Sequence, residues 1–234
     1  MNQMKRIMVT ATLIFTILTS LAVAQATHGV IFPGKSFREA LEDIVMYGAT
    51  AMSHEWAKAS SKERTDVFEL RGSRESSDGR VLILHSVSPN LGEPYKVKTI
   101  SIIPPASNAK PEVVSSLKLL RNFKPSSSPG CGFYSGEPLA EALYDIVQSG
   151  AIPISHELAK ASSRERTDVF KLHDGRVLIL HSNSRKLKEP FTLQKVSTIS
   201  SNEQKRPETH SSFRLLFPGK ENEDAAKWLN SKDL

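Results

Sequence analysis

The residues of this sequence that could carry out chemistry gather in one short region, and the same residue types recur further along the chain. The first set holds two histidines, three acids and three bases: His54, Glu55, Lys58, Glu63, Arg64, Asp66, Arg80 and His85. The second set keeps the same order: His156, Glu157, Lys160, Glu165, Arg166, Asp168, Arg176 and His181. Histidines and carboxylates are the usual general acids and bases of enzymes, so one hypothesis is a hydrolase with a site in each copy.

The hydrolase hypothesis takes His54, Glu55 and His85 as catalytic candidates, with the counterparts His156, Glu157 and His181. It requires the two histidines of a copy to reach one reacting group. The zinc pattern H-E-x-x-H has a histidine where this chain has Lys58 or Lys160, and lysine is not a usual zinc ligand. We therefore expect no metal and no cofactor. The charged residues fit equally well on a solvated helix face held by salt bridges.

These residues lie in a tandem duplication. The stretch from Ser53 to Leu70 returns from Ser155 to Leu172 with fifteen of eighteen positions identical, and residues 78–86 return at 174–182 without a change. Residues 87–103 keep only six of seventeen positions at 183–199. A unit of this size used twice is typical of one supersecondary module. The strongest agreement falls on the polar region.

The elements that would position the polar residues follow from their periodicity. Apolar residues at helical spacing predict a helix from Phe37 to Gly48, started by a Ser36–Glu39 capping box, and a second copy from Pro138 to Gly150. Ser53 and Ser155 look like N-caps of a second short helix that runs to about Arg64 in the first copy. Extended runs then surround the Asp-Gly pairs at 78–79 and 174–175, which predict hairpins.

The predicted fold class is therefore α+β, a tandem duplication of an ααββββ module in which two short helices pack on a four-stranded antiparallel sheet. We expect a signal peptide at 1–26, module 1 at 32–123, a Ser/Pro/Gly linker at 124–136, module 2 at 137–220 and a C-terminal helix or tail at 221–234. This order of elements after an export signal resembles the architecture of the β-lactamase inhibitory protein. The resemblance is one of fold alone and implies no function.

The composition points to an exported globular protein. Lys5 and Arg6, an apolar stretch and small residues near Ala24 predict export to the periplasm or the medium after cleavage. The net charge of +6 falls by two when Lys5 and Arg6 are removed, and the remaining charges are interspersed, so no nucleic acid is expected as a partner. Cys131 is the only cysteine, so it is either an incidental thiol or the site of an intermolecular disulfide.

The hypothesis that we favour is an exported non-catalytic binding or inhibitory protein, whose two modules present a broad surface to a protein or a cell-envelope polymer. The binding candidates are the bases of the repeated region together with two aromatic residues: Trp56, Lys58, Arg64, Arg80, Tyr95, Lys160, Arg166 and Arg176. Trp56, Tyr95 and the loop from Arg71 to Ser77 differ between the copies and would contact the partner. Binding of a polyanion is a third hypothesis, which a salt-insensitive interaction would exclude. The membrane is involved only through the export signal, and the oligomeric state stays unknown.

Overall fold

The computed structural model describes residues 29–71, 77–105, 110–119, 133–200, 207–213 and 215. The predicted signal peptide, the C-terminal segment 221–234, most of the linker and Cys131 lie outside these residues. Within them, no helix is long and apolar enough to cross a membrane.

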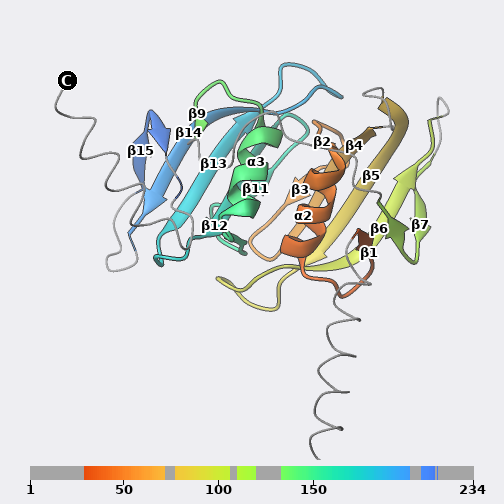
Figure 1. The fold of residues 1–234 in the computed structure, drawn as a ribbon, viewed down its shortest axis with the longest axis horizontal. Coiled ribbons are helices and arrows are strands. Elements are labelled where there is room, and N and C mark those ends of the chain that lie inside the picture. The colour runs from red at the N-terminus through yellow and green to blue at the C-terminus, as the bar shows by residue number, and fades with distance from the viewer. Residues whose placement is uncertain are drawn as a thin grey trace, which may run out of the picture.

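Strands dominate the fold, and twelve of them form one antiparallel sheet in the order β15-β14-β13-β12-β11-β3-β4-β5-β6-β7, with β2 beside β4 and β10 beside β12 (Figure 1). The first half contributes β2 (Thr50–Ala51), β3 (Lys58–Ala59), β4 (Glu63–Arg71), β5 (Ser77–Val87), β6 (Lys96–Ile103) and β7 (Glu112–Val114). The second half contributes β10 (Ile152–Pro153), β11 (Lys160–Ala161), β12 (Glu165–Lys171), β13 (Val177–Asn183), β14 (Thr192–Ile199) and β15 (Glu208–His210). The two halves therefore share one sheet and one order of elements.

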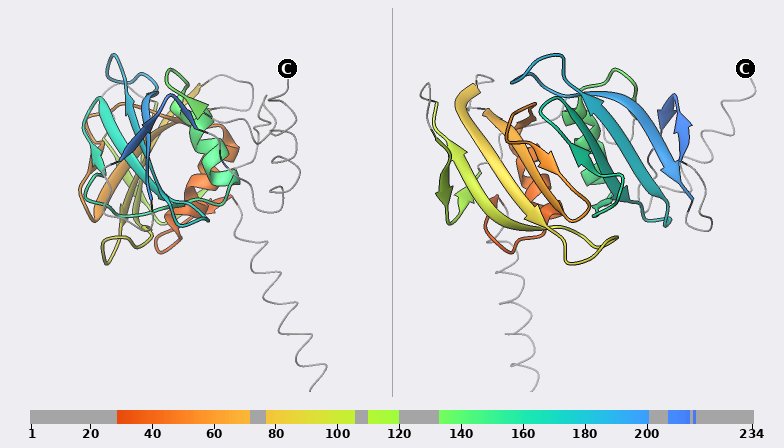
Figure 2. Two further views of the ribbon diagram at one scale, coloured as in Figure 1. Left: turned by 90° about the vertical axis from the view of Figure 1, so that its left-hand side faces the viewer. Right: turned by 180° about the vertical axis from the view of Figure 1, so that it is seen from behind.

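Two helices, α2 (Phe37–Tyr47) and α3 (Leu139–Gln148), lie side by side on one face of this sheet (Figure 1). Figure 2 shows that the sheet curves around them. Gly48 ends α2 in the left-handed conformation at φ 83°, as the sequence predicts. The expected capping box is wrong, because the Ser36 side chain makes no capping hydrogen bond.

Two small sheets complete the described structure. One joins β1 (Val30–Ile31) to β8 (Leu117–Lys118), and the other joins β9 (Phe133–Tyr134) to β16 (Ser212–Phe213). Leu117 and Lys118 therefore pair outside the main sheet.

The main sheet buries apolar side chains on both faces. Along β4, Phe68 belongs to the large core that includes both helices, whereas Val67 belongs to a small cluster with Ala57 and Ile83. Since successive residues of a strand point to opposite faces, Arg64 and Asp66 share the helix side with Phe68, and Thr65 shares the other side with Val67. We call these the inner face and the outer face.

The predicted fold class is wrong. Ser53 to Arg64 contains no helix: a turn at Glu55 and Trp56 is followed by the short strand β3 and a second turn before β4. Among the described residues each half has one helix, and the sheet is continuous across both halves rather than two sheets of four strands. Helix propensity and caps are weak local preferences, and the strand pairing across the two halves overrides them here. The resemblance to the β-lactamase inhibitory protein rested on the second helix and is dropped with it.

The hairpin between the long strands differs in length between the halves. In the second half a tight turn at Asp174 and Gly175 joins strands of seven residues, and Gly175 has φ 84°. In the first half the six extra residues lengthen the hairpin, so β4 has nine residues and β5 eleven. The tip of this longer hairpin, residues 72–76, lies outside the described residues.

Candidate functional site

The two halves meet where β3 pairs with β11 through Ala59 and Ala161, and we call this junction the seam. Ala59 and Ala161 occupy the same position in their respective copies. Pairing of a residue with its own counterpart is the mark of an isologous interface, in which one surface contacts itself about a two-fold axis. The seam is therefore a pseudo-two-fold axis within a single chain.

Reciprocal hydrogen bonds across the seam follow this symmetry. The hydroxyl of Ser53 donates to the carbonyl of Lys186 in the other half at 2.6 Å, and the hydroxyl of Ser155 donates to the carbonyl of Asn90 at 2.6 Å. Both serines are fully buried. The sequence marks them as helix caps, but their actual partners lie in the loop before the third long strand of the opposite half.

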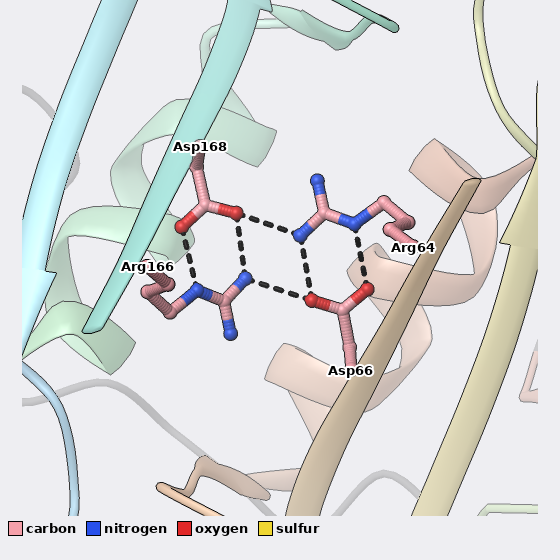
Figure 3. A network of polar contacts seen from close by, with 4 residues as sticks. All are labelled: Arg64, Asp66, Arg166 and Asp168. Carbon is pink, nitrogen blue, oxygen red and sulfur yellow. Dashed lines mark hydrogen bonds and ion pairs between the residues drawn. The ribbon is translucent and has the colours of Figure 1, made fainter. Parts of the chain in front are cut away.

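Four charged side chains form a closed network on the inner face of the seam (Figure 3). Arg64 binds Asp66 through Nε and Nη2 at 2.7 and 2.6 Å, and its Nη2 also donates to Asp168 at 2.6 Å. Arg166 binds Asp168 at 2.7 and 2.6 Å and donates to Asp66 at 2.8 Å. All four side chains are at most 6% exposed. We call this set the charge network.

The charge network holds its groups ionised although it is buried. Burial disfavours the charged guanidinium groups, but the two aspartates outweigh it and raise the pKa of Arg64 and of Arg166. Burial alone would raise the pKa of Asp168, yet the two arginines lower it to about 2. Arg64 also lies over the ring of Tyr95, with its Cζ 5.5 Å from the centroid. The network therefore acts as a structural junction of the halves.

The outer face of the seam carries a different polar set. Lys58 is the cross-strand neighbour of Thr65, and Thr65 is the neighbour of His85. The Thr65 hydroxyl lies 3.2 Å from His85 Nδ1. In the second half Lys160, Thr167 and His181 repeat this row, with 2.9 Å between the Thr167 hydroxyl and His181 Nδ1. We call each set a Lys-Thr-His row.

An open pocket of about 410 Å³ lies over the first row, and residues of both halves line it: Lys58, Ala59, Ser60, Glu63, Arg64, Thr65, His85 and Ala161. Every lining residue has an identical counterpart in the other copy: Lys160, Ala161, Ser162, Glu165, Arg166, Thr167, His181 and Ala59. Lys58, Ser60 and Glu63 are exposed, and Thr65 and His85 are half-buried. The pocket offers an ammonium, hydroxyls, an imidazole edge and a carboxylate to a polar ligand.

The two histidines that the hydrolase hypothesis groups together, His54 and His85, have different hydrogen-bond partners in the structure. His54 is buried in the turn after β2, where its Nδ1 accepts a hydrogen bond from the Trp56 backbone N–H at 3.3 Å. Burial lowers the pKa of His54. His156 makes the matching bond to the Leu158 N–H at 3.1 Å. His85 bonds Thr65 instead, and Glu55 is exposed at the turn, as is its counterpart Glu157.

Some of the binding candidates are exposed and others are buried. Lys58 and Lys160 are exposed beside the seam, and Trp56 is 45% exposed. Arg64 and Arg166 belong to the charge network, and Tyr95 is fully buried, which keeps its ring away from any partner. Arg80 is half-buried, and Arg176 forms an ion pair with Asp174 at 2.6 Å.

Sequence reasoning missed Thr65 and Thr167 as well as the link from Arg64 to Asp168. The alternation of Glu63, Thr65 and Val67 on one face could have indicated the threonine, had residues 58–64 not been assigned to a helix. Among the described residues, no three His, Cys, Asp or Glu side chains come together as a metal site requires.

Fold and site thus define a single-chain protein of two like halves, joined by one sheet and carrying matched polar rows at the junction. Comparison with known proteins found no matching family model, no matching curated protein and no matching solved structure.

Proposed function

We propose that this is an exported, non-catalytic binding protein that holds a protein or a cell-envelope polymer against the outer face of the seam. The observation that carries the proposal is the pocket over the first Lys-Thr-His row, all of whose lining residues recur identically in the other half. The outer face therefore presents the same binding groups twice.

The identity of the exposed lining residues Lys58 and Glu63 has no structural explanation in the seam itself. Ser53, Arg64 and Asp66 are buried and contact the opposite half, so the symmetry of the interface accounts for their recurrence. Lys58 and Glu63 are exposed, and no described residue forms an ion pair with either side chain. Exposed positions close by do differ between the halves, since Lys62 is replaced by Arg164 and Trp56 by Leu158. Binding of a ligand would explain why a lysine and a glutamate are found at these positions, Lys58 and Glu63, in both halves.

Binding without catalysis fits the chemistry of the rows. An activated hydroxyl needs a histidine base that a third group orients. The Thr65 hydroxyl does face His85, but no carboxylate among the described residues bonds the opposite nitrogen of that ring. The same holds for Thr167 and His181. The rows supply hydrogen-bond donors and acceptors and lack an oriented base.

The test is retention of cell-envelope material on the immobilised protein. The variant K58E/K160E reverses both exposed lysines of the rows and should lose the retained protein or polysaccharide. The control K118E/K171E makes the same change in charge at exposed lysines outside the rows and should retain it. Equal retention by both variants, or release of hydrolysed fragments by the wild-type protein, would contradict the proposal.

A further inference from the structure

Resting on the proposed function, we infer that each Lys-Thr-His row is an oxyanion site and that the ligand is a linear anionic polysaccharide occupying both rows at once. Its sulfate, phosphate or carboxylate groups would each lie between a lysine ammonium and a histidine N–H.

The donors of a row follow from the strand register. Lys58, Thr65 and His85 are neighbours on three adjacent strands, so the lysine and the imidazole flank the threonine on one face. When the Thr65 hydroxyl donates to Nδ1, the ring proton is held on Nε2. No described residue bonds Nε2 of His85 or the ammonium of Lys58. Two donors are therefore free to hold an oxyanion, which is the stronger type of hydrogen-bond acceptor.

The second row carries an additional cation. Lys195 is the cross-strand partner of His181, whereas Thr99 occupies this place beside His85. Burial lowers the pKa of His181, and the charge of Lys195 lowers it further. A bound oxyanion would offset the effect of Lys195, so the second row should bind the more tightly of the two.

The acids beside the rows limit the charge density that the ligand can have. Glu63 lines the pocket two residues before Thr65, and Glu165 holds the same position before Thr167. Each carboxylate repels a ligand of very high charge density and accepts hydrogen bonds from neutral hydroxyls. The pocket has no Phe, Tyr or Trp among its lining residues, so it lacks the large aromatic rings on which nucleobases usually stack. A polysaccharide with spaced charges and free hydroxyls fits this lining better than a nucleic acid.

The two rows favour a polymer over a small anion. Thr65 on β4 and Thr167 on β12 are separated by three strand spacings, which places the rows roughly 15 Å apart. Once one oxyanion group is held, a second group on the same chain reaches the other row at a high effective concentration. A long chain should therefore bind far more tightly than its isolated repeating unit.

Calorimetric titration of the purified protein tests the inference with dextran sulfate of low sulfate content, whose charges are spaced along the chain, and with a sulfated disaccharide, neutral dextran and double-stranded DNA. Dextran sulfate should bind at least about tenfold more tightly than the disaccharide, and neutral dextran should not bind. K58M/K160M should weaken dextran sulfate binding by about tenfold or more. E63Q/E165Q should strengthen it, and K118M/K171M should leave it within about twofold, because those exposed lysines lie outside the rows.

Other outcomes overturn the inference. Equal losses from K58M/K160M and K118M/K171M would show diffuse electrostatic attraction, and tighter binding of DNA would exclude a polysaccharide. Equal affinity for disaccharide and polymer would exclude joint use of the rows. If dextran sulfate does not bind while K58E/K160E still loses envelope material, the ligand class is wrong and the proposed function stands. If neither interaction is found, both fail.

Discussion

The guanidinium of Arg64 donates a 2.6 Å hydrogen bond to the carboxylate of Asp168, which lies 104 positions later in the chain. Its mirror image joins Arg166 to Asp66 at 2.8 Å. Because each residue bonds the counterpart of its own partner, the charge network closes on itself at the seam (Figure 3). The two halves are therefore held together by a hydrogen bond from each arginine to the aspartate of the opposite half.

Loss of one acid from this network should strongly destabilise the protein. D168N leaves two buried guanidinium groups with one carboxylate, and breaking a buried ion pair in this way costs about 3–5 kcal/mol. Urea unfolding at pH 7 measures the difference in free energy of unfolding between D168N and the wild-type protein. The defect should shrink as the pH falls from about 4 to about 2, because Asp168, with its pKa lowered to about 2, loses its own contribution to stability in that range.

The control for D168N replaces all four charges together. R64M/D66L/R166M/D168L leaves no unpaired charge, and such replacements are often neutral or stabilising. If the quadruple variant has a free energy of unfolding as low as that of D168N, side-chain shape rather than charge pairing stabilises the seam.

Asp145 should destabilise the protein at neutral pH. Its counterpart Asp43 binds the ammonium of Lys35 at 2.5 Å, but the second half has Glu137 in place of that lysine. Burial, together with the charge of Glu141, raises the pKa of Asp145 to about 6. A raised pKa means that stability is full below about pH 4 and is lost as the pH rises through 6. D145N should therefore raise the free energy of unfolding at pH 7 by about 1–2 kcal/mol.

The matched variant D43N should act in the opposite direction, because it removes the negative charge that pairs with the ammonium of Lys35. Urea unfolding of both variants at pH 4 and pH 7 checks the pair. A gain from D145N that is equally large at pH 4 would contradict the role of ionisation.

Replacement of Lys188 by glycine should stabilise the protein. Lys188 is the one non-glycine residue of the described chain with a positive φ, at 64°, and its counterpart in the first half is Gly92, at φ 80°. Both residues donate their backbone N–H across the seam, to the carbonyls of Ser53 and Ser155. A side chain in this region costs about 1 kcal/mol, so K188G should stabilise by roughly that amount and G92K should destabilise similarly. Thermal unfolding of the two variants decides, and a loss of stability in K188G would count against backbone strain at this turn.

Local patterns were sufficient for some elements. The apolar spacing from Phe37 and the left-handed Gly48 predict α2, which forms as expected. The apolar run from Val81 to Leu84 predicts a strand and lies in β5, although Asp78 and Gly79, expected in the hairpin turn, belong to the same strand. These features depend on contacts close in sequence or on a single buried face, which a linear pattern records directly.

Local sequence patterns could not identify the residues that meet at the seam. Ser53 followed by Glu55 has the pattern of a helix start, but Ser53 is fully buried and its hydroxyl bonds Lys186. Arg64 and Asp66 look like a surface ion pair because the rest of the network that buries them, Arg166 and Asp168, lies in the other half. Their burial is possible only once the seam forms, so no property of residues 53–66 alone indicates it.

The amino-acid sequence by itself determined the duplication, its register and the residue types that recur, because two copies can be compared position by position. The tertiary structure decided what those residues do. Pairing of β3 with β11 placed Arg64 and Asp66 inside the junction and left Lys58, Thr65 and His85 on its outer surface. The physical reason is the strand itself, since adjacent residues point to opposite faces and a shift of one residue exchanges the buried set for the exposed one.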